Sequence, residues 1–312
     1  AISNKVLYEG LMKPMARRTL IQTAEKNGIS WRGNANELEG TEAVYEQFKS
    51  IEKKDIDYPE YYLQPFHAYT EGNLCWQAAF EAEAATYSMG LRVWPKDDLT
   101  WEVAQDRLRD SYIDCIADHI AEYNLSQPQD IIDMGCSVGL STRAIHDRWP
   151  EANMIGLDLS PYMLSVAALR DADAAAAAGQ RVYKASPDGQ QARRSWMHGK
   201  AEDTGLASAS YDLISLAYVL HECPQQASTD IIREAARLLR PGGVLVLCDN
   251  NPKSSVIQNL PPALFTLMKS TEPHSDEYYT LDIEETMREA GFTDVHTVPS
   301  DPRHRTVLGT RS

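Results

Sequence analysis

The chain has 312 residues and a mass of 34.9 kDa, which is long for one compact domain and short for two full ones. Hydrophobic residues make up 43% and charged residues 24%, so the composition supports a sizeable core and argues against a mostly disordered chain. The 45 acidic and 30 basic side chains give a formal net charge of -15. This is the wrong sign for binding a phosphate backbone, so we expect no nucleic-acid partner.

The five cysteines are an odd number and include no C-x-x-C pair, which indicates neither a disulfide framework nor a zinc site. We therefore expect no metal, and a reducing compartment such as the cytoplasm or an organelle matrix or stroma. No stretch approaches the roughly 18–20 uninterrupted apolar residues of a membrane helix, so we expect no membrane span. Because the chain begins at Ala1, we expect that a tag or a targeting peptide was removed.

Residues 1–125 are predicted to form a helical cap. Apolar residues recur at a spacing near 3.6 in Trp76–Met89 and Leu99–Tyr123, which favours helices there. Glycines and prolines divide the rest of this region, which indicates short helices joined by turns.

Residues 126–312 alternate short apolar runs with helical patterns, which predicts an α/β unit with a doubly wound, mostly parallel, seven-stranded sheet. The last two runs flank a Pro-Ser-Asp-Pro turn, and this predicts a hairpin that puts one antiparallel strand into the sheet. A segment at about residues 250–281 is too long for a plain connection. The expected strands are Asp130–Met134, Asn153–Leu157, Ser195–His198, Tyr211–Ala217, Val244–Cys248, Thr293–Val298 and Arg305–Thr310.

The densest chemical signal is the glycine-rich stretch Asp133–Gly139, which lies between an apolar run and a helical pattern. Such a turn lets the backbone approach a ligand closely and exposes the amides of a helix N-terminus. A dinucleotide-binding fingerprint would need G-x-G-x-x-G, whereas only Gly135 and Gly139 match and an additional acid opens the loop. The pattern therefore disfavours a nicotinamide enzyme.

The order D-x-G-x-x-x-G resembles the first motif of the class I S-adenosylmethionine-dependent methyltransferases, and the resemblance extends over roughly Asp130–Ser312. Further matching segments follow in the family's order at Gly156–Asp158, His198–Asp203, Tyr211–Leu216 and Leu239–Gly243. The resemblance implies a Rossmann-like fold with S-adenosylmethionine as cofactor. The residues it assigns to the cofactor are Asp133, Gly135, Cys136, Ser137, Gly139, Asp158, Leu159, Ala201, Glu202 and Ala217.

Two cofactor contacts are specific in this resemblance. Asp158 would accept hydrogen bonds from both ribose hydroxyls, and Leu159 would lie against the adenine. Lys200 stands where many members have an acid that reads the adenine, so that role moves to Ala201, Glu202 or Asp203.

The resemblance implies an in-line displacement in which an acceptor's lone pair attacks the sulfonium methyl. Methyltransferases that act on exocyclic base nitrogens or glutamine amides usually carry a [DN]-P-P-[YF] motif after the fourth strand. This chain has no such motif there. His221 is then the candidate general base, because its ordinary pKa is near neutral, with Glu222 as an alternative or an orienting partner. The competing interpretation is that His221 begins a helix and binds the backbone or a water beside the cofactor.

Aromatic residues and one histidine crowd the stretch Tyr61–Tyr69 of the predicted cap. They would either anchor the cap on the sheet or close over the site, and His67 and Tyr69 are the cap-side catalytic candidates. Asp249, at the end of a strand, is a second candidate for orienting the acceptor. The resemblance places an acceptor lid at about residues 250–281, with a short helix over Pro261–Ser270.

The function expected from these residues is methyl transfer to a small-molecule acceptor, with similarity to the small-molecule C- and O-methyltransferases. Two alternatives stay open: a binding or assembly subunit that keeps the fold without turnover, and an enzyme that methylates a protein side chain. A protein partner or a homo-oligomer is compatible with either. The intact Asp133, Gly135, Gly139 and Asp158 favour a working cofactor site.

Overall fold

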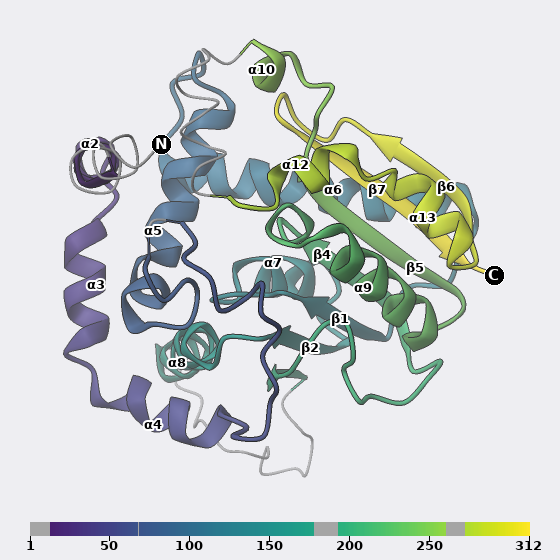
Figure 1. Cartoon of the computed structure of the whole chain (residues 1–312), viewed down its shortest axis with the longest axis horizontal. Coiled ribbons are helices and arrows are strands. Elements are labelled where there is room, and N and C mark those ends of the chain that lie inside the picture. Colours follow the sequence, from purple (N-terminus) through teal and green to yellow (C-terminus); the bar gives the residue numbers. More distant parts are fainter. Residues whose placement is uncertain (1–12, 68, 178–192, 260–271) are drawn as a thin grey trace.

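A seven-stranded sheet forms the centre of the chain in the computed structural model, which describes residues 13–67, 69–177, 193–259 and 272–312 (Figure 1). The strand order across the sheet is β3-β2-β1-β4-β5-β7-β6. This confirms the predicted doubly wound α/β sheet. The strands are β1 (Asp130–Met134), β2 (Asn153–Asp158), β3 (Arg194–His198), β4 (Tyr211–Ala217), β5 (Leu239–Asn250), β6 (Phe292–Val298) and β7 (His304–Arg311).

Strands β1 to β5 are parallel to one another, and β7 runs antiparallel to both β5 and β6. The hairpin expected around the Pro-Ser-Asp-Pro turn is therefore confirmed, and its second strand inserts between β5 and β6. A tight turn is enough for this antiparallel pair, whereas each parallel pair needs a helical crossover. The strand order reverses between β1 and β4, and open α/β sheets bind their ligands in the crevice outside the carboxyl ends of the strands at such a reversal.

Helices cover both faces of the sheet because consecutive strand residues point to opposite sides. Ile131 packs against α6 (Trp101–Glu122) and α7 (Leu140–Arg148), whereas its neighbour Ile132 packs on the side of α9 (Gln225–Leu238) and α13 (Ile283–Glu289). Leu213 and Ile214 on β4 divide in the same way. The strands are thus buried on both faces, which explains their nearly continuous apolar runs.

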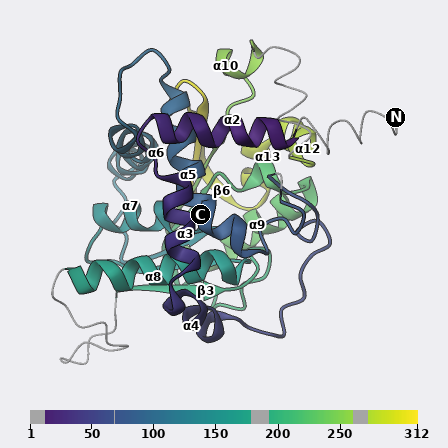
Figure 2. The ribbon, with the colours of Figure 1, turned by 90° about the vertical axis from the view of Figure 1, so that its left-hand side faces the viewer.

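Three of the remaining four N-terminal helices pack around α8 (Pro161–Ala177), and the first of the four packs on two of them. Leu38, Val44 and Phe80 bury against Val166 and Leu169 of α8. Figure 2 shows α2 and α3 outermost, in front of α5 and above α8. These helices are α2 (Lys13–Lys26), α3 (Trp31–Glu39), α4 (Glu42–Ile51) and α5 (Trp76–Val93).

The segment that joins α4 to α5 has little regular structure and passes the carboxyl ends of the strands (Figure 1). We call its described residues, 52–67 and 69–75, the strap. Lys53 donates its amide to His198 at the end of β3, and Asn73 accepts a bond from Ser160 just after β2. The strap therefore connects the cap helices to the carboxyl ends of the strands.

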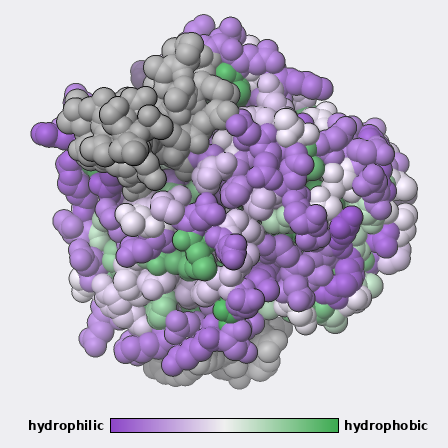
Figure 3. Space-filling model, in the orientation of Figure 1, coloured by the Kyte–Doolittle hydropathy of each residue, from purple (hydrophilic) through white to green (hydrophobic). Residues whose placement is uncertain are grey.

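The long segment after β5 is described in part, with helices α10 (Ser255–Gln258) and α12 (Ser275–Thr280). The short helix expected over Pro261–Ser270 lies outside the described residues. Among the described helices, none combines the length and apolarity needed to cross a bilayer. Hydrophilic residues cover most of the face in Figure 3, with only small groups of hydrophobic ones, in keeping with the large acidic excess.

Candidate active site

The turn between β1 and α7 has a backbone that two glycines make accessible. Gly135 and Gly139 have φ values of 71° and 79°, in the left-handed region that favours glycine. A Cβ at Gly139 would lie 2.3 Å from the ring of Trp196, and a Cβ at Gly135 would lie 2.6 Å from Val219. Conformation and close packing together therefore require glycine at both positions.

The acid that opens this turn positions the following helix. One oxygen of the fully buried Asp133 accepts hydrogen bonds from the hydroxyls of Ser141 and Thr142, at 2.6 and 2.7 Å. Burial raises the pKa of Asp133, and the two hydroxyls oppose this rise. Asp133 thus fixes the start of α7, which supports the loop from behind.

Several loop amides bind within the protein. Gly135 and Cys136 both donate to the carbonyl of Leu157, at 2.7 and 3.0 Å, and Gly139 donates to the carbonyl of Cys136. The Cys136 thiol is buried, which raises its pKa well above the ordinary value. The amides of Gly135, Cys136 and Gly139 are therefore already bonded within the protein. These residues contribute the shape of the loop rather than free hydrogen-bond donors.

Asp158 ends β2 and faces this loop. Its two oxygens accept the amides of Ser137 and Ser160, each at 2.7 Å. Burial raises the pKa of Asp158 to about 6, although the two amides and the Tyr62 hydroxyl favour the ionised form. Leu159 is buried directly after it.

Tyrosines of the strap reach the acids around the crevice. Tyr61 donates to Glu202 at 2.5 Å, and the Tyr62 hydroxyl contacts Asp158. Tyr58 bonds to His198 at 3.1 Å. The sequence reasoning did not assign Tyr58 or Tyr62 to the site, and the density of aromatic residues in this stretch was the only signal that pointed to them.

His221 and Asp249 form a buried pair on the neighbouring strand ends. Nδ1 of His221 lies 2.8 Å from Oδ1 of Asp249, and the His221 amide donates to the other carboxylate oxygen at 3.1 Å. Burial alone would lower the pKa of His221, but Asp249, with help from Glu272 and Glu222, outweighs it and raises that pKa to about 10. The pair joins the turn after β4 to the end of β5.

Glu222 and His67 lie beside this pair. Nδ1 of His67 is 3.9 Å from the Glu222 carboxylate, which also accepts a bond from Asn73 at 3.1 Å. Burial raises the pKa of Glu222 to about 8, and burial together with the charge of His221 lowers the pKa of His67 to about 3. Three of the four expected catalytic side chains, His67, His221 and Glu222, thus meet at one place.

The fourth expected catalytic side chain, Tyr69, does not join them. Its hydroxyl donates to Glu81 of α5 at 2.7 Å, and Glu81 also pairs with Arg17 of α2. The ring packs in the cluster that holds the cap against α8. Tyr69 therefore anchors the cap, as the alternative interpretation of this aromatic stretch proposed.

The other expected cofactor residues border the crevice or its support. Ala217 is the last residue of β4 and packs in part against the core below the loop. Ala201 packs in part against the core on the opposite face of the sheet, next to Glu202. Their backbone positions at strand ends agree with a ligand at this edge of the sheet.

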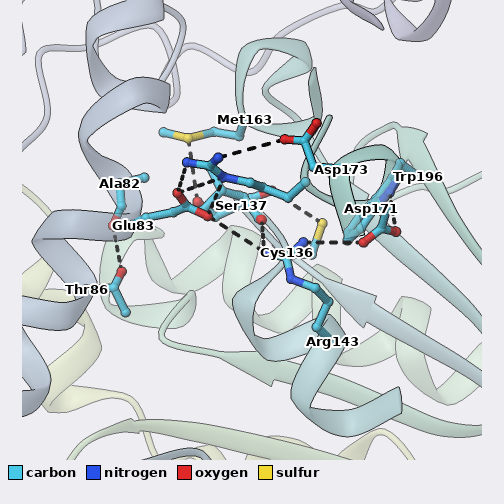
Figure 4. A network of polar contacts seen from close by, with 12 residues as sticks. Ala82, Glu83, Thr86, Cys136, Ser137, Arg143, Met163, Asp171, Asp173 and Trp196 are labelled. Carbon is cyan, nitrogen blue, oxygen red and sulfur yellow. Dashed lines mark hydrogen bonds and ion pairs between the residues drawn. The ribbon is translucent and has the colours of Figure 1, made fainter. Parts of the chain in front are cut away.

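A charged network holds the cap beside the glycine-rich turn (Figure 4). Glu83 of α5, whose side chain is 8% exposed, receives a forked pair of bonds from Arg170 of α8, the shortest at 2.8 Å. Arg143 of α7 lies within 4.0 Å of Glu83 and 3.7 Å of Asp171. Three helices from different parts of the chain are thereby locked together next to the loop.

Comparison with known proteins agrees with this geometry. Residues 132–247 match the family model described as a methyltransferase domain. An uncharacterized methyltransferase of Synechocystis is 26% identical over 169 residues, which cover 54% of this chain and 69% of that protein. A trans-aconitate 2-methyltransferase of Azoarcus is 30% identical over 149 residues, which cover 47% of this chain and 50% of that protein.

Among solved structures, a putative O-methyltransferase of Nostoc punctiforme has a TM-score of 0.51 at 20% identity, over 89% of this chain and 72% of that one. This likeness shows the fold. The chain spans about half the length of the trans-aconitate relative. The match to the family model, residues 132–247, includes the glycine-rich turn. Residues 132–247 thus match a methyltransferase domain, and together with the ordered motifs these matches support a class I S-adenosylmethionine-dependent methyltransferase.

Proposed function

We propose that this chain transfers the methyl group of S-adenosylmethionine to a small-molecule acceptor, and that His221, oriented by Asp249, removes the acceptor's proton. The observation that supports this most directly is the buried His221–Asp249 pair at the carboxyl ends of β4 and β5. Asp249 occupies Nδ1 of the imidazole, so Nε2 remains to meet an acceptor. The trans-aconitate relative acts on a small molecule, which favours the same acceptor class here.

The residues around the turn fit this cofactor. Asp158 is a buried carboxylate with two amide bonds, and its remaining lone pairs suit a ribose diol. Nε of Arg109 is buried and has no hydrogen-bond partner among the described residues, next to the ring of Tyr218. This guanidinium would suit the carboxylate of the methionine part. We infer that Asp158 holds the ribose and Arg109 the carboxylate.

The proton transfer can be written on this chain's own residues. When bound, the cofactor supplies an activated methyl group, so the protein mainly has to align the reactants. The bond from the acceptor atom to hydrogen breaks, and its proton passes to Nε2 of His221. The freed lone pair would then be available to the methyl carbon, the electrons of the carbon–sulfur bond would pass to sulfur, and S-adenosylhomocysteine would leave.

His221 can act as the base only after its imidazole has lost the proton that the surrounding carboxyl groups favour. The carboxyl groups of Asp249, Glu272 and Glu222 keep the imidazole protonated in the absence of a second cation. Because S-adenosylmethionine is a sulfonium cation, its binding would lower the pKa of His221, since like charges disfavour the protonated form. His67 and Glu222 line the same space, and we propose that they contact the acceptor.

Binding of the cofactor is tested by calorimetry with S-adenosylmethionine and S-adenosylhomocysteine. We expect saturable binding that weakens about tenfold or more in Asp158→Ala, because a charged acceptor of two hydroxyls is lost. Asp230→Ala, at an exposed position on α9, is the matched control and should bind as the wild type does. If the folded wild type binds neither compound, the result would instead support the alternative of a binding or assembly subunit without turnover.

The base is tested with labelled methyl donor and a panel of small hydroxy, carboxylate and carbon acids. For an accepted substrate, His221→Ala should lower turnover by about 10²-fold or more with cofactor affinity within twofold of the wild type. Asp249→Asn should lower turnover less, and His296→Ala, on the distant strand β6, should have no effect. A fully active His221→Ala enzyme would remove His221 as the base.

A further inference from the structure

Two histidines and a glutamate converge at the mouth of the crevice. One donor atom from each of His67, His221 and Glu272 lies within 4.8 Å of the other two. The three residues come from the strap, from the 3-10 turn Leu220–Glu222 and from the segment that leads into α12. They are up to 205 positions apart in the sequence (272 minus 67), so no local pattern announces the cluster.

The surroundings of His221 have the form found around metal-binding imidazoles. Its Nδ1 is bonded to Asp249 at 2.8 Å, which leaves Nε2 as the nitrogen available to a ligand. A histidine that binds a metal almost always donates its other ring N–H to a carboxylate or carbonyl, which fixes the ring and raises its basicity. Asp249 provides this second contact with both of its oxygens engaged.

Glu272 supplies an independent indication of a missing partner. Its Oε2 atom is buried and has no hydrogen-bond partner among the described residues. A buried carboxylate oxygen without a partner destabilises the fold unless a donor or a cation satisfies it. The neighbouring carboxyl group of Asp249 adds like charge, which the charges of His221 and Arg303 oppose.

His67 is held in place at a cost to the backbone. Its φ is 46°, in the left-handed region that non-glycine residues rarely adopt, and its ring packs on Phe66 with centroids 4.1 Å apart. Strained residues of this kind gather at functional sites, where the surrounding structure over-determines their conformation.

We propose that His67, His221 and Glu272 form a binding site for a divalent transition-metal ion, with Asp249 orienting His221. Imidazole and carboxylate donors suit zinc, iron, cobalt or nickel better than magnesium or calcium, which take oxygen ligands. Donors around a tetrahedral ion with bonds of about 2.0–2.1 Å lie roughly 3.3 Å apart. The three side chains must therefore close by up to about 1.5 Å, which the long Glu272 side chain allows.

Three protein ligands leave at least one position open, as in catalytic metal sites. An oxygen of the acceptor would take that position, and an ion-bound hydroxyl loses its proton more readily. Occupancy of Nε2 by the ion excludes a proton there, so the base role proposed for His221 applies to the metal-free protein, and in the metal-bound protein the proton of the ion-bound hydroxyl would pass to solvent. Metal binding itself does not depend on the proposed methyl transfer, because none of the three donors is assigned to the cofactor.

The test uses the full chain, stripped with a chelator and titrated with Co²⁺ while visible absorption is recorded, without methyl donor. We expect one equivalent to bind and to give the ligand-field bands of a nitrogen and oxygen site. His67→Ala and Glu272→Gln should each weaken binding at least tenfold. Asp249→Asn should weaken it by about 10–100-fold, as for other residues that orient a metal ligand.

Two controls separate loss of the site from loss of the fold or a competing site. Each variant is checked for wild-type affinity for S-adenosylhomocysteine, which also separates failure of this proposal from failure of the proposed function. The stacked pair His119 and His296 is the other place where two imidazoles meet, so His296→Ala should bind Co²⁺ as the wild type does. No saturable Co²⁺ binding, or binding lost only in His296→Ala, would overturn the proposal.

Discussion

At the residue scale, the site depends on a few positions where only one side chain fits the local geometry. Gly139 combines a left-handed backbone with direct contact to Trp196, and Asp158 combines burial with two amide donors. The first property concerns shape and the second concerns charge. Each leads to a measurable prediction.

Gly139→Ala should destabilise the fold and abolish detectable cofactor binding. The left-handed conformation costs about 1 kcal/mol for alanine, and the clash with Trp196 adds to it, so we expect a loss of about 2–4 kcal/mol in free energy of unfolding. Urea unfolding measures this loss. Gly205→Ala is the matched control, because Gly205 is also left-handed, with φ 69°, but has nothing within 4 Å of its Cβ position. Equal losses in the two variants would contradict the packing argument.

Cofactor affinity should fall in acid because of Asp158. Its pKa of about 6 is above the ordinary aspartate value, so below pH 6 the folded protein carries the protonated, uncharged form. That form accepts hydrogen bonds from the ribose more weakly, and affinity should drop by up to tenfold per pH unit below 6 and level off above 7. Calorimetry at pH 5 and 7.5 tests this. If Asp158→Asn showed the same pH dependence, another group would be responsible.

At the element scale, the cap is attached by ion pairs and by the strap. Glu83 joins α5 to α8 and α7, while tyrosines of the strap bind acids at the strand ends. The sequence predicted the main helices and the strands because their apolar periodicities are regular. It did not predict which charged residues would pair, because Glu83 and Arg170 are 87 positions apart.

Glu83→Ala should loosen the cap and destabilise the protein. Removing one member of a buried pair leaves Arg170 without its partner, which costs about 2–4 kcal/mol after allowance for the partial exposure of Arg170. Thermal or urea unfolding followed by circular dichroism measures the change. Asp97→Ala breaks the exposed pair with Arg107 and should cost less than about 1 kcal/mol. Similar losses in both variants would show that the network in Figure 4 carries no special weight.

At the scale of the whole molecule, the candidate active site is shared between the sheet and the N-terminal region. Asp158 comes from β2, His221 from the turn after β4, and Tyr62 from the strap. A ligand bound there would contact both parts. Ligand binding should therefore stabilise them together.

Hydrogen exchange with and without S-adenosylhomocysteine tests this coupling. We expect slower exchange both in residues 133–160 and in the strap, because the bound ligand would hold Tyr62 and Asp158 in one arrangement. The far strand β6 should change little and serves as the internal control. Protection confined to residues 133–160 would show that the strap takes no part in binding.

The sequence by itself determined the sheet, the mostly parallel direction of its strands, the final hairpin and the glycine-rich turn. These features follow from periodicity and from short motifs that neighbouring residues complete. Only the tertiary structure decided which distant side chains meet. His221 meets Asp249 because β4 and β5 are adjacent, and His67 and Glu272 join them because the strap and the segment before α12 pass the same strand ends. Tyr69 likewise bonds to Glu81 of the cap because the packing of the helices brings these two side chains together. A local sequence pattern does not encode that packing.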